Sequence, residues 1–123
     1  GRVFNPNNET DVFWRQLRAA GFIAGDPADT GIAALPTNPW GGLISITTQT
    51  VNGGLGGNKV CMSQVPGSAA IAIDNEMDDG NGASGRLRAT QGTSGTNTNP
   101  SNTALGGGGV YSEDNEYTLC YRM

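Results

Sequence analysis

The first regular pattern along the chain is helical and lies near the N-terminus. Apolar residues recur at helix spacing between positions 12 and 20, and Trp14 stands at the border of that face. The face consists of Val12, Phe13, Leu17 and Ala20. Gly21 follows, and glycine readily adopts the left-handed conformation that ends a helix. The pattern predicts a short helix that stops at Gly21.

A hairpin is expected in the middle of the chain. Residues 25–42 contain three prolines and predict an extended loop, from which Trp40 packs back onto the body. Residues 43–51 are rich in β-branched side chains and predict a strand. Residues 52–58 form a glycine-rich turn that returns the chain into a second strand over 59–63.

A second helix is expected directly after the hairpin, followed by a turn and a strand. Its apolar face is formed by Ala69, Ala72, Ile73 and Met77. Pro66 precedes this face, where a first-turn proline loses no hydrogen bond. Residues 78–82 are Asp, Asn and Gly, which favour a turn, and residues 86–90 alternate as in a half-buried strand.

The C-terminal part combines a polar loop with a last strand. Residues 91–109 are uncharged and of low complexity, and they predict a long surface loop. Residues 117–121 alternate strictly, with the two tyrosines and Leu119 on one face and with Thr118 and Cys120 on the other. The order of elements predicts a single α+β domain over residues 1–123. We expect a small antiparallel sheet of about four strands, with two short helices gathered on one side.

Composition and charge narrow the classes of function. Only 15% of the residues are charged, 36% are hydrophobic and 20 are glycine, which is typical of a small domain with long loops. The net charge is −4 and there is one lysine, so no nucleic-acid partner is expected, because phosphate binding needs clustered Lys and Arg. No apolar stretch is long enough to span a bilayer.

Carboxylates are the remaining candidates for chemistry because the chain has no histidine. Five residues near this turn could offer oxygen ligands to calcium, but their spacing falls one residue outside the EF-hand pattern. They are Asp74, Glu76, Asp78, Asp79 and Asn81, and the weak calcium candidates among them are Asp74, Asp78 and Asp79. We favour a structural role, in which Asp78, Asp79 and Gly80 fix the turn between helix and strand. No cofactor is expected, with calcium as the weaker alternative.

Two further groups of residues have a functional and a structural interpretation. A second acidic group, Glu113, Asp114 and Glu116, is expected to be a solvated loop. Trp14 and Trp40 could stack on sugar rings, but core or loop-anchoring roles are favoured. The loop 91–109 contacts a partner or coats the surface, and the sequence leaves both open.

Two segments carry a resemblance to a known family. The first is Phe13-Trp14-Arg15-Gln16-Leu17 with Ala20-Gly21-Phe22-Ile23, and the second runs from Ile73-Asp74 through Met77-Asp78-Asp79-Gly80 to Gly85-Arg86-Leu87-Arg88-Ala89. Both segments resemble segments of type IV pilin-like proteins and pseudopilins, and they occur in the same order as in that family. Glu76 stands where the family usually has Lys, and Gly82 stands near a usual Pro. The family's leader-peptidase site and long apolar helix are not in this chain.

The resemblance implies the head domain of a structural subunit in a type IV pilus or pilus-like fibre, as a major or minor pilin or pseudopilin. Such a head is a small antiparallel sheet packed against a long N-terminal helix, and it performs no catalysis. Its partners would be other pilin subunits, and its only membrane contact would be through the missing helix. It would be located outside the cell or in the periplasm, and in the inner membrane before assembly. Gly1-Arg2 would then be an interior or engineered start.

The resemblance also bears on Cys61 and Cys120. In a cytosolic protein they would be two unrelated buried thiols, whereas in an exported domain we expect them to pair and to hold the C-terminal strand. An alternative function is a secreted module that recognises carbohydrate or a surface protein through Trp40 and the loop 91–109. A third is a small secreted hydrolase, whose activity would be lost on Asp78→Asn or Asp79→Asn.

Overall fold

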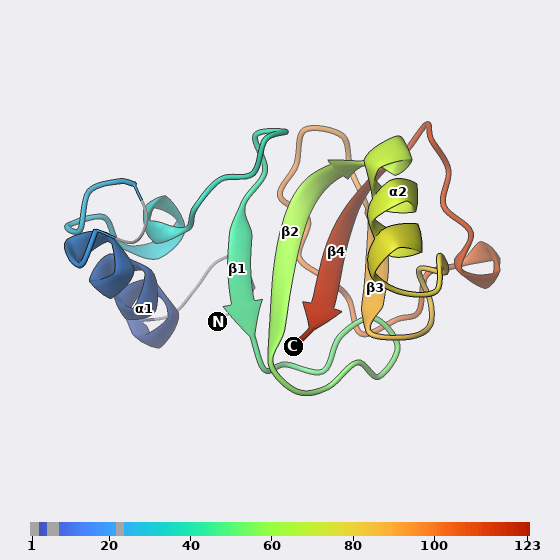
Figure 1. The fold of residues 1–123 in the computed structure, drawn as a ribbon, viewed down its shortest axis with the longest axis horizontal. Coiled ribbons are helices and arrows are strands. Elements are labelled where there is room, and N and C mark those ends of the chain that lie inside the picture. The colour runs from blue at the N-terminus through green and yellow to red at the C-terminus, as the bar shows by residue number, and fades with distance from the viewer. Residues whose placement is uncertain (1–2, 5–7, 22–23) are drawn as a thin grey trace.

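The computed structural model describes residues 3–4, 8–21 and 24–123. Its centre is a four-stranded antiparallel sheet in the order β1-β2-β4-β3 (Figure 1). The strands are β1 (Ile44–Thr47), β2 (Lys59–Pro66), β3 (Leu87–Gly92) and β4 (Glu116–Arg122). The helices are α1 (Asn8–Ala19) and α2 (Gly67–Met77), with short 3-10 helices at Gly31–Ala34 and Gly107–Gly109. The expected α+β fold with four strands and two helices is confirmed.

The two helices do not lie on one side of the sheet, as the order of elements suggested. Helix α2 contacts β2 and β4 and lies in front of β3, whereas α1 lies beyond the β1 edge beside the 3-10 helix at Gly31–Ala34 (Figure 1). Arg18 holds α1 there, because its buried guanidinium donates to the carbonyl oxygens of Ala24, at 3.0 Å, and of Ala34. The sheet face between α1 and α2 therefore has no helix above it.

Each face of the sheet has its own apolar cluster. The cluster on the α2 face contains Val65, Ala70, Leu87, Ala89, Tyr111, Tyr117 and Leu119. The second cluster lies on the opposite face and continues round the β1 edge, where Leu17, Ile44 and Ile46 pack against it. Its buried members are Val3, Phe4, Trp14, Ala34, Leu35, Leu43, Val51, Leu55, Cys61 and Cys120. Strand β4 lies between β2 and β3 and contributes to both clusters, which explains why residues 117–120 are all buried.

The buried faces of both helices differ from those expected. In α1, Trp14 and Arg18 are buried while Phe13 is 41% exposed and Ala20 is exposed; the side chain of Val12 lies outside the described part of the chain. In α2 the buried positions are Gly67, Ala70 and Asp74, while Ala72 and Met77 are exposed. One residue turns a helix by about 100°, so a small error in phase moves the whole face. In α2 the buried Asp74 has a partner that no helical pattern reveals.

Several loop predictions are also corrected. Strand β1 is shorter than residues 43–51, and Trp40, which was expected to pack back onto the body, remains 38% exposed. The loop 91–109 runs over the surface as expected, but it also makes hydrogen bonds to the rest of the chain. Its first two residues belong to β3, and Asn99 accepts a hydrogen bond from Phe4 N while Ser101 O accepts one from Asn52 N. The expectations on Gly1, Arg2, Phe22 and Ile23 lie outside the described residues.

Candidate functional site

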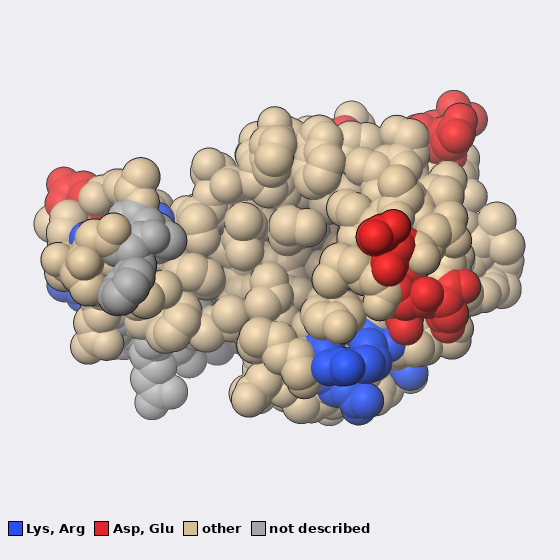
Figure 2. Space-filling view, in the orientation of Figure 1, with Lys and Arg blue, Asp and Glu red and all other residues tan. Residues whose placement is uncertain are grey.

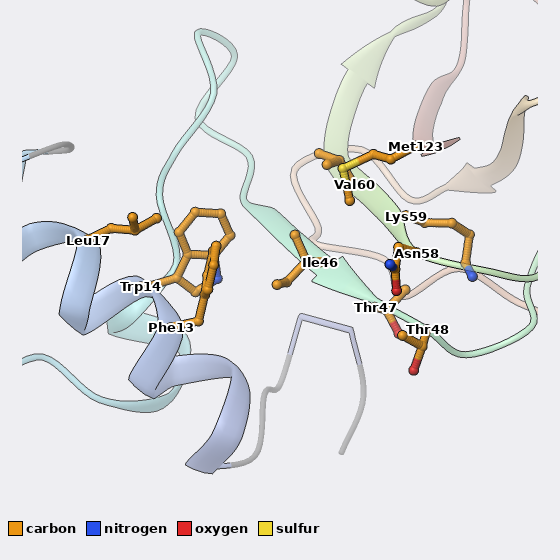
Figure 3. A pocket seen from close by; sticks show the side chains of 10 residues that line it. All are labelled: Phe13, Trp14, Leu17, Ile46, Thr47, Thr48, Asn58, Lys59, Val60 and Met123. Atoms are coloured by element: carbon orange, nitrogen blue, oxygen red, sulfur yellow. The ribbon is translucent and has the colours of Figure 1, made fainter.

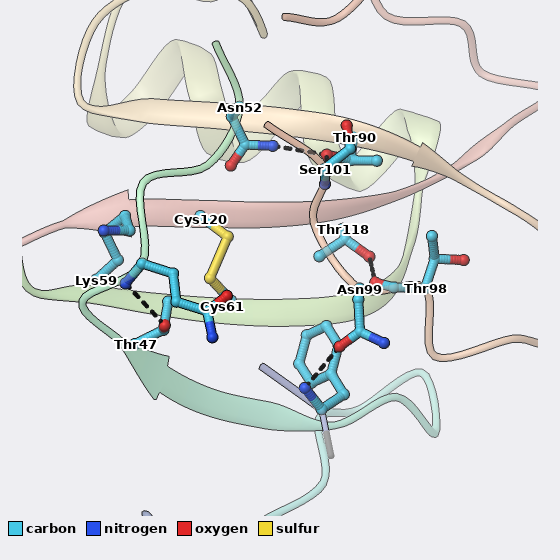
Figure 4. Close-up of a disulfide and its surroundings, with 12 residues drawn as sticks. Thr47, Asn52, Lys59, Cys61, Thr90, Thr98, Asn99, Ser101, Thr118 and Cys120 are labelled. Carbon is cyan, nitrogen blue, oxygen red and sulfur yellow. Dashed lines mark hydrogen bonds between the residues drawn. A yellow bond between two sulfur atoms is a disulfide. The ribbon is translucent and has the colours of Figure 1, made fainter. Parts of the chain in front are cut away.

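The disulfide between Cys61 and Cys120 is present. These residues are directly opposite each other on β2 and β4, and both are fully buried. Figure 4 shows the bridge at the centre of the sheet, with Thr98, Asn99 and Ser101 of the long loop lying over the same face. Thr118 Oγ1 donates to Thr98 O at 2.5 Å, so the loop is attached to the strand that the disulfide holds. The bridge and the loop together cover this side of the sheet.

The acidic turn after α2 brings Asp74, Asp78 and Asp79 together, with carboxylate oxygens within 4.8 Å of one another. Most of these oxygens already accept hydrogen bonds from the chain. Asp78 Oδ2 accepts from Leu87 N at 3.0 Å, and Asp79 accepts from Asn81 N and Ser84 Oγ. These bonds close the corner between α2 and β3, which is the structural role expected of Asp78 and Asp79. A calcium ion here would compete with these donors, and calcium binding stays a prediction.

Gly80 and Gly85 complete this turn. Both have positive φ, +76° and +74°, which glycine adopts without strain. A Cβ atom on Gly80 would lie 2.3 Å from Asn75 Oδ1, and one on Gly85 would lie 2.1 Å from Asp78 Oδ2. A larger residue would therefore displace Asn75 at the first position and Asp78, which holds the corner, at the second.

Asp74 is the buried anchor of the corner. Its Oδ1 accepts from Gly80 N at 3.0 Å and its Oδ2 accepts from Tyr111 Oη at 2.5 Å, which joins α2 to the segment before β4. Burial raises the pKa of the Asp74 carboxyl, although the hydrogen bonds from Tyr111 and Gly80 oppose this shift. The pKa of Tyr111 is raised, first by burial and then by its bond to Asp74, so the phenol stays protonated and donates. No pattern in the sequence indicated that the Tyr111 hydroxyl would donate to Asp74.

The remaining acidic residues are separate from this corner. Glu113 and Asp114 are exposed, and the Glu116 carboxylate accepts hydrogen bonds from Ser94 Oγ and Gly95 N, both at 3.1 Å.

Within the corner itself, the pKa of Asp79 is lowered, first by its hydrogen bond from Ser84 and then by the one from Asn81 N.

A large groove lies on the α2 face of the sheet, beside α1 (Figure 3). Its volume is about 700 Å³. One wall is formed by Phe13, Trp14 and Leu17 of α1, which point towards Ile46 on β1. The other lining residues are Thr47, Thr48, Asn58, Lys59, Val60 and Met123. The groove is therefore built from α1, the two neighbouring strands β1 and β2, and the C-terminus.

The floor of this groove belongs to two apolar rows that cross the sheet. Strand register places Ile46, Val60, Tyr121 and Leu87 in one row and Ile44, Met62, Leu119 and Ala89 in the next. Helix α2 buries the β3 end, where Leu87 and Ala89 are fully covered. The β1 and β2 ends, Ile44, Ile46, Val60 and Met62, are only half-buried. The apolar surface thus extends further than the helix that covers it.

A second, smaller cavity of about 270 Å³ continues from the groove towards α2. Val60 lines both spaces, and Ile73 and Met77 of α2 form the far wall. No acidic or basic side chain appears on the middle of this face in Figure 2; a basic patch lies below it at the lower edge, acidic patches lie over and beside α2, and further charges lie at the α1 end. Lys59 is fully buried, which lowers its pKa, and its Nζ donates to Gly57 O at 2.5 Å.

The groove was not predicted from the sequence, although a signal for it exists. In β1 and β2 the residues on the α2 face, Ile44, Ile46, Val60 and Met62, are all apolar. The opposite face of the same strands is also buried. An apolar strand face needs a cover, and neither helix lies above this part of β1 and β2 (Figure 1).

Comparison of this chain with models of protein families, with curated proteins and with solved structures found no match. Within the part of the chain that the structure describes, no helix has the length and apolar character needed to cross a membrane.

Proposed function

We propose that this domain is the head of a structural subunit in a type IV pilus or pilus-like fibre, a pilin or pseudopilin. The observation that carries the proposal is the uncovered apolar groove between α1 and α2. In this proposal the groove receives an apolar helix that precedes residue 1 in the full-length protein. The same helix would anchor the subunit in the inner membrane before assembly and join it to other subunits in the fibre.

The dimensions and chemistry of the groove support a helical occupant. The uncovered strip spans β1 and β2, two strands about 4.8 Å apart, and is bordered by the side chains of α1 and α2. At about 4.8 Å per strand, two strands present a strip roughly 10 Å wide, which is close to the diameter of about 10 Å of one α-helix with its side chains. The absence of charge on the middle of this face matches an apolar helix better than a polar peptide (Figure 2).

The resemblance to pilin-like proteins adds support because its two segments border this groove. Phe13, Trp14 and Leu17 come from the first segment and line the α1 side. Ile73 and Met77 come from the second segment and line the α2 side. The disulfide fits an exported domain, since such bonds persist in oxidising compartments. The proposal places the domain in the fibre or periplasm, assigns it no catalysis, and gives it no nucleic-acid partner.

Val60→Asp in the full-length protein tests this proposal. Val60 is half-buried and lies at the junction of the groove and the smaller cavity, so a carboxylate there would be desolvated by a packed helix. We expect the amount of subunit in fibres sheared from the cells to fall about tenfold or more, because a cost of roughly 1.4 kcal/mol is a factor of ten.

Val110→Asp is the matched control because Val110 is 74% exposed and lines neither the groove nor the smaller cavity. This variant should assemble as the native protein does. Thermal melts of both variants of the isolated chain separate a folding defect from an assembly defect. Normal assembly of a folded Val60→Asp variant would contradict the proposal, as would an equal defect in both variants.

A further inference from the structure

The turn that carries Trp40 is held rigidly at one end of the sheet. Asn38 organises it: its Oδ1 accepts from Trp40 N and Gly42 N, and its Nδ2 donates to Ser63 O at 2.7 Å. Asn38 N also donates to Gly42 O at 2.9 Å. Gly42 packs so closely on β2 that a Cβ atom would lie 2.1 Å from Ser63 O. The fold thus fixes the backbone of a turn whose tryptophan remains 38% exposed.

Next to this turn, β2 contains a strained bulge. Gln64 is one of two non-glycine residues with positive φ among the described residues, at +56°, and the register of β2 against β4 shifts between Met62 and Val65. Non-glycine residues in this conformation cost about 1–3 kcal/mol and gather at functional sites. Bulges also redirect side chains at the ends of sheets. Here the bulge directs Gln64 towards the long loop.

The long loop meets the bulge at Asn97. Asn97 Oδ1 accepts from Ser63 Oγ at 2.7 Å and from Gln64 Nε2 at 2.8 Å, so Asn38, Ser63 and Asn97 link the Trp40 turn to the loop. Among the described residues, Asn97 Nδ2 and Gln64 Oε1 have no hydrogen-bond partner, and both residues are only half-buried. One free donor and one free acceptor therefore lie on two adjoining amides.

The three segments that meet here contain no charged residue. This holds for residues 36–43, 62–65 and 96–98, which are instead rich in Asn, Gln, Ser and Thr. A protein-binding hot spot is a densely packed apolar centre, whereas this surface offers one aromatic ring among amides and hydroxyls. That combination matches a pyranose, which has an apolar C–H face and a rim of hydroxyl groups.

We propose that Trp40, the bulge at Gln64 and the loop residue Asn97 form a binding surface for neutral carbohydrate. The indole of Trp40 would stack on the C–H face of a sugar ring. The free donor of Asn97 and the free acceptor of Gln64 would bind its hydroxyl groups. None of these residues lines the groove, so this surface is independent of the proposed role in a fibre.

Saturation-transfer NMR of the chain with neutral hexose and N-acetylhexosamine oligosaccharides tests the inference. We expect saturation to reach the ring C–H protons of at least one oligosaccharide. Trp40→Ala should weaken binding about fivefold or more, and Trp40→Tyr should restore part of it, because an aromatic ring supplies the stacking contact. Phe13→Ala removes an aromatic side chain of similar exposure, 41%, from the groove and should leave binding unchanged.

A failed sugar site and a failed fibre proposal give different results, because this test needs neither assembly nor an upstream helix. The inference is overturned if no neutral oligosaccharide shows transfer at millimolar concentration, or if Trp40→Ala and the native chain give equal signals. Binding only of sulfated or uronic-acid sugars would also overturn it. So would a protein ligand that binds through Trp40 in the absence of any sugar signal.

Discussion

Removal of the Cys61–Cys120 disulfide is expected to lower the free energy of unfolding by about 4 kcal/mol. The two cysteines are 59 residues apart in the sequence, so the bond greatly restricts the unfolded chain. It also holds β4, the strand that contributes to both apolar clusters. A domain of this length should lose roughly 4 °C in Tm per kcal/mol, or about 15 °C. The measurement is a thermal melt of Cys61→Ala/Cys120→Ala beside the native chain.

Alanine is the suitable replacement for both cysteines, because serine would place an unpaired hydroxyl at two positions that are fully buried. The native chain reduced under denaturing conditions and refolded with reductant present should melt near the double variant. Intact mass before and after reduction should differ by two hydrogen atoms. Unchanged melting after reduction, or two free thiols in the purified chain, would contradict the expectation.

Asp74→Ala is expected to lower the free energy of unfolding by about 3 kcal/mol, because each buried polar group left without a partner costs about 1–3 kcal/mol. The variant leaves Gly80 N and Tyr111 Oη without their acceptors. The corner between α2 and β3 and the anchor of Tyr111 would be lost together. Urea denaturation measures this change. Ser84→Ala is a mild comparison, since it removes only the exposed hydrogen bond to Asp79.

Asp74→Asn separates the charge of this residue from its shape. The pKa of the Asp74 carboxyl is raised above 3.8 in the folded chain, so the folded state binds this proton more tightly than the unfolded state. The resulting stabilisation is fully present below the unfolded pKa and is lost as pH rises through the folded pKa. We therefore expect the native chain to gain stability relative to Asp74→Asn as pH is lowered into this window. A constant difference between the two chains across that range would contradict the assignment.

The strands could be predicted because their signals are local, whereas pairing of the two cysteines was expected mainly from the resemblance to an exported domain. Alternation in residues 59–63 and 117–121 placed Cys61 and Cys120 inside strands, and the glycine-rich turn predicted their hairpin partner β1. The turn Asp78-Asp79-Gly80 was also predictable, because Asp and Gly favour turn conformations for local reasons that do not depend on the rest of the fold.

The groove and the helix faces could not be predicted from local patterns. A short helix with few large side chains, such as α2, has a weak apolar periodicity. A carboxylate such as Asp74 is expected to face solvent, and only its hydrogen bond from Tyr111 explains why it is buried. The groove depends on how far α2 extends across the sheet and on where Arg18 holds α1, which are both tertiary properties. The contacts of Asn97 and Asn99 were also hidden, because polar loop residues bind through hydrogen bonds that leave no apolar pattern.

Site-specific photo-crosslinking in the full-length protein tests most directly whether an apolar helix occupies the groove. A benzophenone amino acid at Ile46, on the groove floor, would be activated in cells and its adducts mapped by mass spectrometry. The same probe at the exposed Val110 is the control. We expect the probe at Ile46 to crosslink to an apolar helix of the same gene product and the probe at Val110 not to do so. Crosslinks from Ile46 only to unrelated proteins, or none at all, would contradict the proposed fibre subunit.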